Sequence, residues 1–282
     1  MEMEILVTTD GSPGSFAALD AANQLATAAG ATLTLVRVLD PVLDAGHAFA
    51  PTLAEAVEQT RVRWQSEMEA LLGEAGIAAT VHILVTARGE STRQGLLRAA
   101  EEHQASLIAI TTRGSGRMRR ALLGSVAMDV LGHSDRPVMV TGPAFVRGVA
   151  PRDYRLVITT DGSPGSLAAM RLLAQEFAVG TIAITLLRIC WPGDVDAQDE
   201  TELQTIAAGL PESADVSVLV REMALIDGAA HGILDVSREL GASAIAMATE
   251  GYRGAYHVFS GSVALSVVSR AEVPVILAKP GR

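Results

Sequence analysis

Short apolar runs alternate with longer amphipathic stretches along the first half of the chain. Five of the runs have the length and composition of buried strands: EILVTT (4–9), ATLTLVRVLDP (31–41), TVHILVTA (80–87), SLIAITTRG (106–114) and RPVMVTGP (136–143). The stretches between them have helical spacing and cover residues 16–30, 51–76, 91–105 and 124–134. Strands that alternate with helices predict a parallel sheet with right-handed crossovers and helices on both faces.

The first strand ends in the turn TTDGSPGS (8–15), which leads into the first helix. Ser12 is a favourable N-cap and Pro13 suits the first helical position, so we expect the helix to begin there. The same octapeptide occurs again at 159–166, with Asp161 in the place of Asp10. One strand-to-helix junction is therefore present twice.

The second half repeats the order of the first. Its apolar runs are RLVITT (155–160), TIAITLLRICWP (181–192), DVSVLV (215–220), SAIAMATEG (243–251) and VPVILAKP (273–280). Arg188 aligns with Arg37. The offset between the copies falls from 161 − 10 = 151 at the aspartates to 261 − 124 = 137 at a late glycine. Most of the missing length falls on residues 192–213, which are acidic and which we predict to be loop-like.

The duplication and the length of 282 residues together predict two domains. We expect the first domain at 1–144, a linker at 145–153 and the second domain at 154–282. Hydrophobic residues make up 49% of the chain, enough for each half to bury a core of its own. The expected fold class is α/β, with two tandem open sheets.

Composition and charge exclude several classes of function. A net charge of −10 disfavours partners such as nucleic acid or an anionic membrane, which need a basic surface. No apolar run reaches the roughly 18 residues of a membrane span, and the start MEMEILV lacks the basic region of a signal peptide, so we expect a cytoplasmic location. The single cysteine, Cys190, excludes an intrachain disulfide and is expected to be an inert buried thiol. The single lysine, Lys279, does not belong to a Walker A loop.

Two kinds of segment lie where a ligand can bind. The turn TTDGSPG follows the first strand of each half, and ligands of open α/β sheets bind at the carboxyl ends of strands. The segment TTRGSGRMRRALLGSV (111–126) has glycines and four arginines that suit a phosphate at the helix opening at Gly124. Its counterpart ATEGYRGAYHVFSGSV (248–263) has Glu250 in place of Arg113, and a carboxylate repels phosphate. The alternatives are a plain N-cap turn and a solvated basic loop.

These features together resemble the universal stress protein family. The pattern consists of ILVTTDGS near the start, the strand LVRVLDP, and a late glycine followed nine residues on by GSV. It covers both halves, so the chain is similar to a tandem member of the family. The resemblance implies a mostly parallel five-stranded sheet of the adenine-nucleotide α-hydrolase type in each half. It also implies that the last strands, RPVMVTGP and VPVILAKP, pair within the chain as a pseudo-dimer, while two chains can still form a homodimer.

The resemblance extends to a motif of ATP-binding members: glycine, two residues, glycine, nine residues, then Gly-Ser or Gly-Thr. The later part of this spacing occurs twice, at Gly114, Gly124 and Ser125 and at Gly251, Gly261 and Ser262. Thr111 and Ala248 stand where the motif has its first glycine. A side chain therefore occupies the place where the backbone approaches phosphate in ATP-binding members.

Carried over residue by residue, the resemblance implies one nucleotide site in each half. In the first half the turn supplies Thr9 and Asp10, the backbone of Val38 meets the adenine, and ribose and phosphates lie along Thr111, Arg113, Gly114, Gly124, Ser125 and Val126. In the second half the equivalents are Thr160, Asp161, Ile189, Ala248, Gly251, Gly261, Ser262 and Val263. The side chains of Val38 and Ile189 are expected to lie in the core.

The ligand that the resemblance implies is ATP or a related adenine nucleotide, ADP or AMP, with Mg²⁺ on the phosphates. The protein would then be a regulator or sensor of the stress response. We expect the first half to bind more tightly, because Arg113 aligns with Glu250. Loss of the first motif glycine favours a second hypothesis, an interaction module that binds no nucleotide. A slow ATPase or phosphotransferase is the third, but the chain has no Walker lysine and no evident catalytic base.

Overall fold

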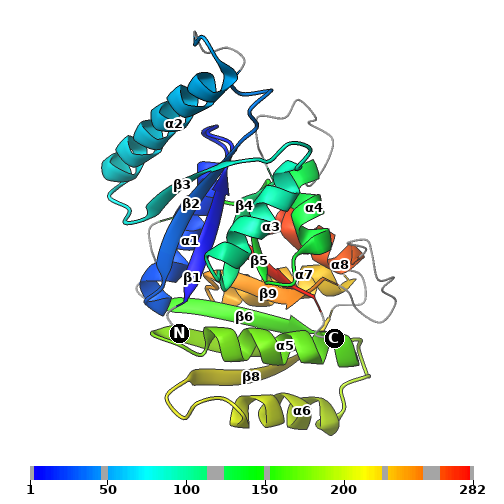
Figure 1. The fold of residues 1–282 in the computed structure, drawn as a ribbon. Helices are drawn as coiled ribbons and strands as arrows, with labels where there is room; N and C mark the ends of the chain where they lie inside the picture. The colour runs from blue at the N-terminus through cyan, green and yellow to red at the C-terminus, as the bar shows by residue number, and fades with distance from the viewer. Residues whose placement is uncertain are drawn as a thin grey trace.

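The computed structural model describes residues 3–45, 50–112, 124–148, 153–223, 228–249 and 261–279. Within these residues ten strands form one sheet, in the order β3-β2-β1-β4-β5-β10-β9-β6-β7-β8 (Figure 1). The strands are β1 (Glu4–Thr9), β2 (Thr32–Leu39), β3 (Thr80–Val85), β4 (Leu107–Thr111), β5 (Val138–Thr141), β6 (Tyr154–Thr160), β7 (Ile182–Cys190), β8 (Asp215–Glu222), β9 (Ala244–Ala248) and β10 (Val275–Ala278). Each half contributes five neighbouring parallel strands, as expected.

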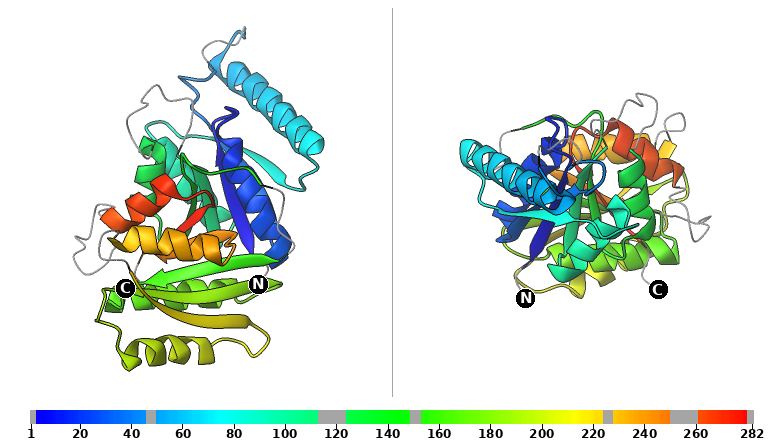
Figure 2. Two further views of the ribbon diagram at one scale, coloured as in Figure 1. Left: turned by 180° about the vertical axis from the view of Figure 1, so that it is seen from behind. Right: turned by 45° about the horizontal axis from the view of Figure 1, so that its top comes forward.

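Helices cover both faces of this sheet (Figures 1 and 2). They are α1 (Phe16–Ala29), α2 (Leu53–Ala75), α3 (Thr92–Glu102), α4 (Ser125–His133), α5 (Pro164–Phe177), α6 (Ala197–Ala208), α7 (Gly228–Glu239) and α8 (Ser262–Arg270). Ile5 and Val7 point into a core shared with α1, α2, α5 and α6, whereas Leu6 points into a second core shared with α3, α4, α7 and α8. Alternate residues of each buried strand thus serve opposite layers, and the predicted α/β class is confirmed.

The two halves join through their last strands. Strands β5 and β10 pair antiparallel, with Met139 opposite Ile276. This confirms the predicted pairing and gives each strand a neighbour on both sides, so neither presents an open sheet edge. Because the pair is antiparallel, the carboxyl ends of the strands point in opposite directions in the two halves.

Further contacts hold the segment that follows β5. The guanidinium of Arg147 lies 2.7 Å from Asp20 on α1, and the backbone N–H of Val146 donates to the carbonyl of Glu272 at 3.0 Å. Burial raises the pKa of Asp20, while the charge of Arg147 lowers it. Residues 145–148 of the expected linker therefore contact both halves.

The prediction that residues 192–213 are loop-like is wrong, because they contain α6. The Asp196 side chain accepts the backbone N–H of Gln198, and the Asp199 carboxylate accepts the backbone N–H of Asp196. Leu203 and Ile206 are buried in the core. A reciprocal cap and two buried side chains are enough to hold this short acidic helix on the sheet.

Candidate functional site

The N-terminal copy of the turn is built by hydrogen bonds among its own residues. The hydroxyl of Thr9 accepts the backbone N–H of Gly11 at 3.0 Å and shares a hydrogen bond with the hydroxyl of Ser15 at 2.6 Å. Asp10 Oδ1 accepts the backbone N–H of Ser12 at 2.9 Å. Thr9 is buried and Asp10 is exposed. Thr9 therefore shapes the turn from within, and Asp10 is the residue that faces solvent.

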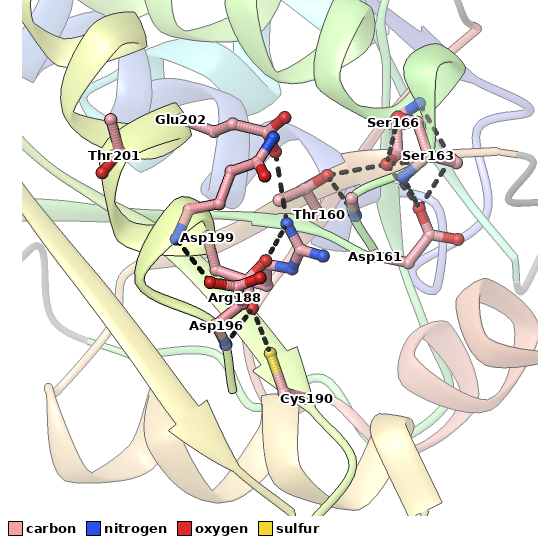
Figure 3. A network of polar contacts seen from close by, with 12 residues as sticks. Thr160, Asp161, Ser163, Ser166, Arg188, Cys190, Asp196, Asp199, Thr201 and Glu202 are labelled. Carbon is pink, nitrogen blue, oxygen red and sulfur yellow. Dashed lines mark hydrogen bonds and ion pairs between the residues drawn. The ribbon is translucent and has the colours of Figure 1, made fainter. Parts of the chain in front are cut away.

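The C-terminal copy has the same core but a richer network (Figure 3). The hydroxyls of Thr160 and Ser166 lie 2.7 Å apart, as in the first copy. Asp161 Oδ1 accepts the backbone N–H of Ser163 at 3.0 Å, the hydroxyl of Ser163 at 2.6 Å, and the hydroxyl of Ser166. The aspartate of this copy is tied to the turn by three hydrogen bonds.

The two copies start their helices at different residues, although their eight residues are identical. Ser163 caps α5 by accepting the backbone N–H of Ser166 at 3.3 Å, and the helix begins at Pro164. In the first copy α1 begins only at Phe16, with Ser15 as an N-cap that makes no side-chain capping bond. The predicted start at Pro13 with Ser12 as the cap is therefore wrong. The Ser12 hydroxyl is instead buried with no hydrogen-bond partner among the described residues.

The end of β4 lies beside the N-terminal turn. Val7 of β1 is opposite Ala109 of β4, which brings Thr9 and Thr111 to the carboxyl ends of neighbouring strands. Gly124 is the N-cap of α4, and no side chain caps this helix. Ser125 and Val126, in its first turn, are exposed.

The C-terminal half has the equivalent arrangement. Thr159 of β6 is opposite Met247 of β9, so Thr160 and Ala248 end neighbouring strands. Gly261 is the N-cap of α8, which also has no side-chain cap. A Cβ at Gly261 would lie 2.5 Å from the carbonyl oxygen of Thr249, so only glycine fits there. In the first turn Ser262 is exposed and Val263 is half-buried.

Uncapped helix N-termini are where backbone N–H groups can meet an anion. The described caps of α2, α3, α5 and α6 all use a Ser, Thr or Asp side chain. Helices α1, α4 and α8 have no such bond. All three begin after the strands at which the sequence predicts the sites.

The remaining predicted site residues divide into two groups. Val38 and Ile189 lie near the ends of β2 and β7, and their side chains pack against the core, as expected. Arg113, Gly114 and Gly251 lie outside the described residues, as does Glu250. The roles of these residues stay predictions.

An arginine that the prediction left out of the site lies against each turn. Arg37 of β2 is opposite Thr9 of β1. A Cβ at Gly11 would lie 2.6 Å from Cζ and Nη1 of Arg37 and 2.8 Å from its Nη2. Because the three distances are nearly equal, the face of the guanidinium packs on the turn. Cζ of Arg37 also lies 3.5 Å from the centre of the Trp64 ring, a cation–π contact with α2.

Arg188 occupies the same place in the C-terminal half (Figure 3). A Cβ at Gly162 would lie 2.4 Å from its Nη2. The helix α6 supplies two carboxylates: Asp199 at 2.7 Å and Glu202 at 3.3 Å from Nη1 of Arg188. The signal for both arginines was in the sequence, since LVRVL and LLRIC each place an arginine within an apolar strand.

The two arginines differ in how their charge is balanced. Outside the turn, the carboxylate of Glu67 lies 3.9 Å from Arg37 and is 52% exposed. Burial lowers the pKa of Arg37, and the charges of Glu67, Asp44 and Asp10 raise it. Arg188 instead contacts a carboxylate that is only 8% exposed.

Asp199 also accepts the thiol of Cys190 at 3.4 Å. Burial, and then the neighbouring Asp199, raise the pKa of this thiol. Cys190 is therefore held as a protonated, buried thiol, in keeping with the expectation that it is inert.

Two further classes of site were sought in the described part of the chain. No group of three or more His, Cys, Asp or Glu side chains is placed there to hold a metal ion. No described helix combines the length and the apolar composition that crossing a membrane requires.

Comparison with known proteins shows that the molecule is a tandem α/β protein with two related domains. A model of the universal stress protein family matches residues 1–142 and again residues 154–279. A universal stress protein of Mycolicibacterium smegmatis is 27% identical over 297 residues, covering 99% of this chain and 98% of that one. Universal stress protein Rv1996 of Mycobacterium tuberculosis is 24% identical over 306 residues, covering 98% and 94%.

The chain belongs to the universal stress protein family, since the family model covers almost its whole length. A solved universal stress protein from Archaeoglobus fulgidus has the same fold, with a TM-score of 0.65 at 22% identity. The two structures match over 99% of this chain and 96% of that one.

Proposed function

We propose that this protein binds ATP or a related adenine nucleotide, ADP or AMP, and acts as a regulator or sensor in the stress response. The observation that carries the proposal is the set of helix N-termini without side-chain caps at the carboxyl ends of β1, β4 and β9. Such N-termini bind phosphate through their backbone N–H groups and the helix dipole. Membership of the universal stress protein family supports the same ligand class.

The nucleotide would extend from one strand end to the next. Its adenine would meet the backbone of Val38, and its phosphates would approach Gly124 and Ser125 at the start of α4. Mg²⁺ in nucleotide sites is bound through phosphate oxygens and one or two carboxylates. The exposed Asp10 is the carboxylate of the turn that fits this part, and the metal would supply positive charge to the phosphates.

The N-terminal half would be the tighter site. Two of its helices, α1 and α4, begin without a side-chain cap, whereas α5 in the other half is capped by Ser163. The arginine beside the C-terminal turn is already neutralised by two carboxylates of α6. In the sequence Glu250 also replaces Arg113. Each of these differences disfavours a polyanion in the C-terminal half.

Binding, and not turnover, is the proposed activity, because no described group at the turn is placed as a catalytic base. At most, slow hydrolysis of ATP would accompany it. We also propose that the protein acts in the cytoplasm, since its net charge of −10 disfavours an anionic membrane surface.

Calorimetric titration of Mg-ATP into nucleotide-stripped protein tests the proposal. Saturable heat is the expected result, and its stoichiometry counts the competent halves. The absence of heat with ATP, together with no binding of ADP or AMP, would contradict it. That outcome would favour an interaction module without nucleotide, in which Thr111 and Ala248 mark sites that lost their first motif glycine.

A further inference from the structure

We propose that Arg37 is a positioning residue of the N-terminal site. Its guanidinium packs between the ligand-binding turn and Trp64, and so holds the turn against α2. The inference rests on the proposed function, since it concerns the same turn. It adds a physical link between that turn and a helix on the outer layer of the molecule. Binding of a ligand to the site would therefore change the environment of Trp64 on α2.

On the turn side the guanidinium of Arg37 packs closely against Gly11. Cζ and the two terminal nitrogens of the guanidinium lie 2.6 to 2.8 Å from the place that a Cβ of Gly11 would take. Gly11 has a φ of +80°, so a larger residue would strain the backbone and would also displace the guanidinium. Asp10, the exposed residue of the turn, immediately precedes Gly11, and its charge acts on Arg37. Any movement of the turn on binding therefore displaces the guanidinium.

On the other side the guanidinium contacts α2. Its Cζ lies 3.5 Å from the centre of the Trp64 ring, and the Arg37 side chain is only 15% exposed. Trp64 itself is buried with Leu39 and Ile83, between α2 and the strands β2 and β3. A planar guanidinium suits this double contact, because its face can pack on a backbone and on an aromatic ring. Arg37 thus joins two parts of the structure that are 53 residues apart in sequence, 64 − 11 = 53.

The C-terminal half makes the same link with different chemistry. Arg188 packs on Gly162 in the same way, but it is held on α6 by Asp199 and Glu202 (Figure 3). In both halves, then, an arginine near the end of the second strand connects the turn to the helix that follows that strand. The recurrence with unrelated partners indicates that the connection itself is what the two copies share.

The chain contains two tryptophans, Trp64 and Trp191. In a Trp191→Phe protein the emission of Trp64 alone reports on the link, while calorimetry in parallel reports on binding. Trp191 is exposed, so this substitution leaves the core intact. We expect the emission of Trp64 to change on titration with Mg-ATP, with the same midpoint as the heat of the tighter site.

Two results of this titration would overturn the inference, and they differ in what they mean. Saturable heat with constant Trp64 emission would show that the nucleotide binds but that the turn does not communicate with α2. No heat with ATP, ADP or AMP would remove the proposed function and the link together.

Substitution of Arg37 distinguishes positioning from a merely structural role. In Arg37→Gln we expect the Kd of the tighter site to rise about tenfold and the Trp64 response to disappear, at a temperature where circular dichroism shows the protein folded. Arg37→Lys should recover part of the affinity, because it restores the cation. Arg171→Gln is the matched control, since Arg171 lies exposed on α5 in the other half and removing it changes the charge equally. An Arg37→Gln protein with lower stability but unchanged Kd and Trp64 response would contradict the proposal.

Discussion

The octapeptide TTDGSPGS occupies the same position in both halves and adopts two different structures. In the C-terminal copy Asp161 binds two serine hydroxyls, and Ser163 caps α5. In the N-terminal copy Asp10 accepts the backbone N–H of Ser12, and α1 starts without a side-chain cap. Since the eight residues are identical, the neighbours must decide between the two structures.

The neighbours that differ are the partners of the arginine beneath each turn. Arg188 is neutralised by Asp199 and Glu202, and Asp161 binds the serine hydroxyls. Arg37 instead stacks on Trp64, and the charge of Asp10 contributes to holding it. The comparison teaches that identical turns differ where the helix after the second strand offers different partners to the arginine.

The largest difference in stability is expected between substitutions of the carboxylates that face the two arginines, Asp199 on α6 and Glu67 on α2. Asp199→Ala should lower the free energy of unfolding by about 3 kcal/mol, because it removes the buried partner of Arg188. Glu67→Ala should cost less than about 0.5 kcal/mol, because that carboxylate is exposed and 3.9 Å from Arg37. Urea unfolding of the two variants measures both values. Equal losses would mean that the two arginines are held alike.

A smaller difference is expected at the two turn glycines, both of which have a positive φ. Gly162→Ala should cost about 2 kcal/mol, because the new Cβ meets a guanidinium fixed by two carboxylates. Gly11→Ala should cost about 1 kcal/mol, since Arg37 can shift on the Trp64 ring. Thermal unfolding of both variants measures the two losses of stability. A greater loss for Gly11→Ala would mean that Arg37 is held more rigidly than Arg188.

The loss of stability on replacing the first serine of the turn should differ by about 1 kcal/mol between Ser163, which caps α5, and Ser12, which does not cap α1. Ser163→Ala removes the cap of α5 and should cost about that amount. Ser12→Ala should leave stability nearly unchanged or raise it, because the Ser12 hydroxyl is buried without a described partner. The pair is matched by sequence, so unfolding midpoints compare directly. A similar loss in both would show that Ser12 caps α1 in solution.

The smallest difference concerns acid stability at the edge strand β3. His82 Nδ1 lies 2.7 Å from His103 Nε2, whereas Ser217 stands at the aligned place in β8. Burial, with the His103 charge, lowers the pKa of His82. The unfolded chain therefore binds more protons once the pH falls below about 6.5, and stability is lost as the pH falls further.

His82→Ser should reduce this loss. Chemical denaturation at pH 7 and pH 5 should show a smaller difference for the variant than for the wild-type protein. The same pH dependence in both proteins would show that His82 does not titrate in this range.

Much of the fold could be predicted from the sequence, because strand and helix periodicity is local information. The strand runs and the duplication were found in this way, whereas the β5–β10 pairing was implied by the resemblance to the universal stress protein family. The helix α6 was missed because its acidic residues resemble a loop, although Asp196 and Asp199 form a reciprocal cap that could have indicated it. The start of α1 could not be found from the octapeptide, since the other copy starts its helix elsewhere.

The site was only partly predictable for the same physical reason. Asp10 follows the end of β1 and Gly124 caps α4, and the alternating pattern identifies both places. Arg37 was aligned with Arg188 but left out of the site, because its partners come from distant segments. Trp64 and Asp199 lie on helices whose packing no local pattern reveals.

The most direct test of the account is calorimetric titration of Mg-ATP into Ser125→Asp and Ser262→Asp. Both serines are exposed in the first turn of their helices. A carboxylate there interacts favourably with the helix dipole but repels phosphate. The account predicts that Ser125→Asp weakens the tighter binding at least about tenfold, while Ser262→Asp leaves it unchanged. Equal effects, or a greater effect of Ser262→Asp, would contradict the claim that the N-terminal half is the better nucleotide site.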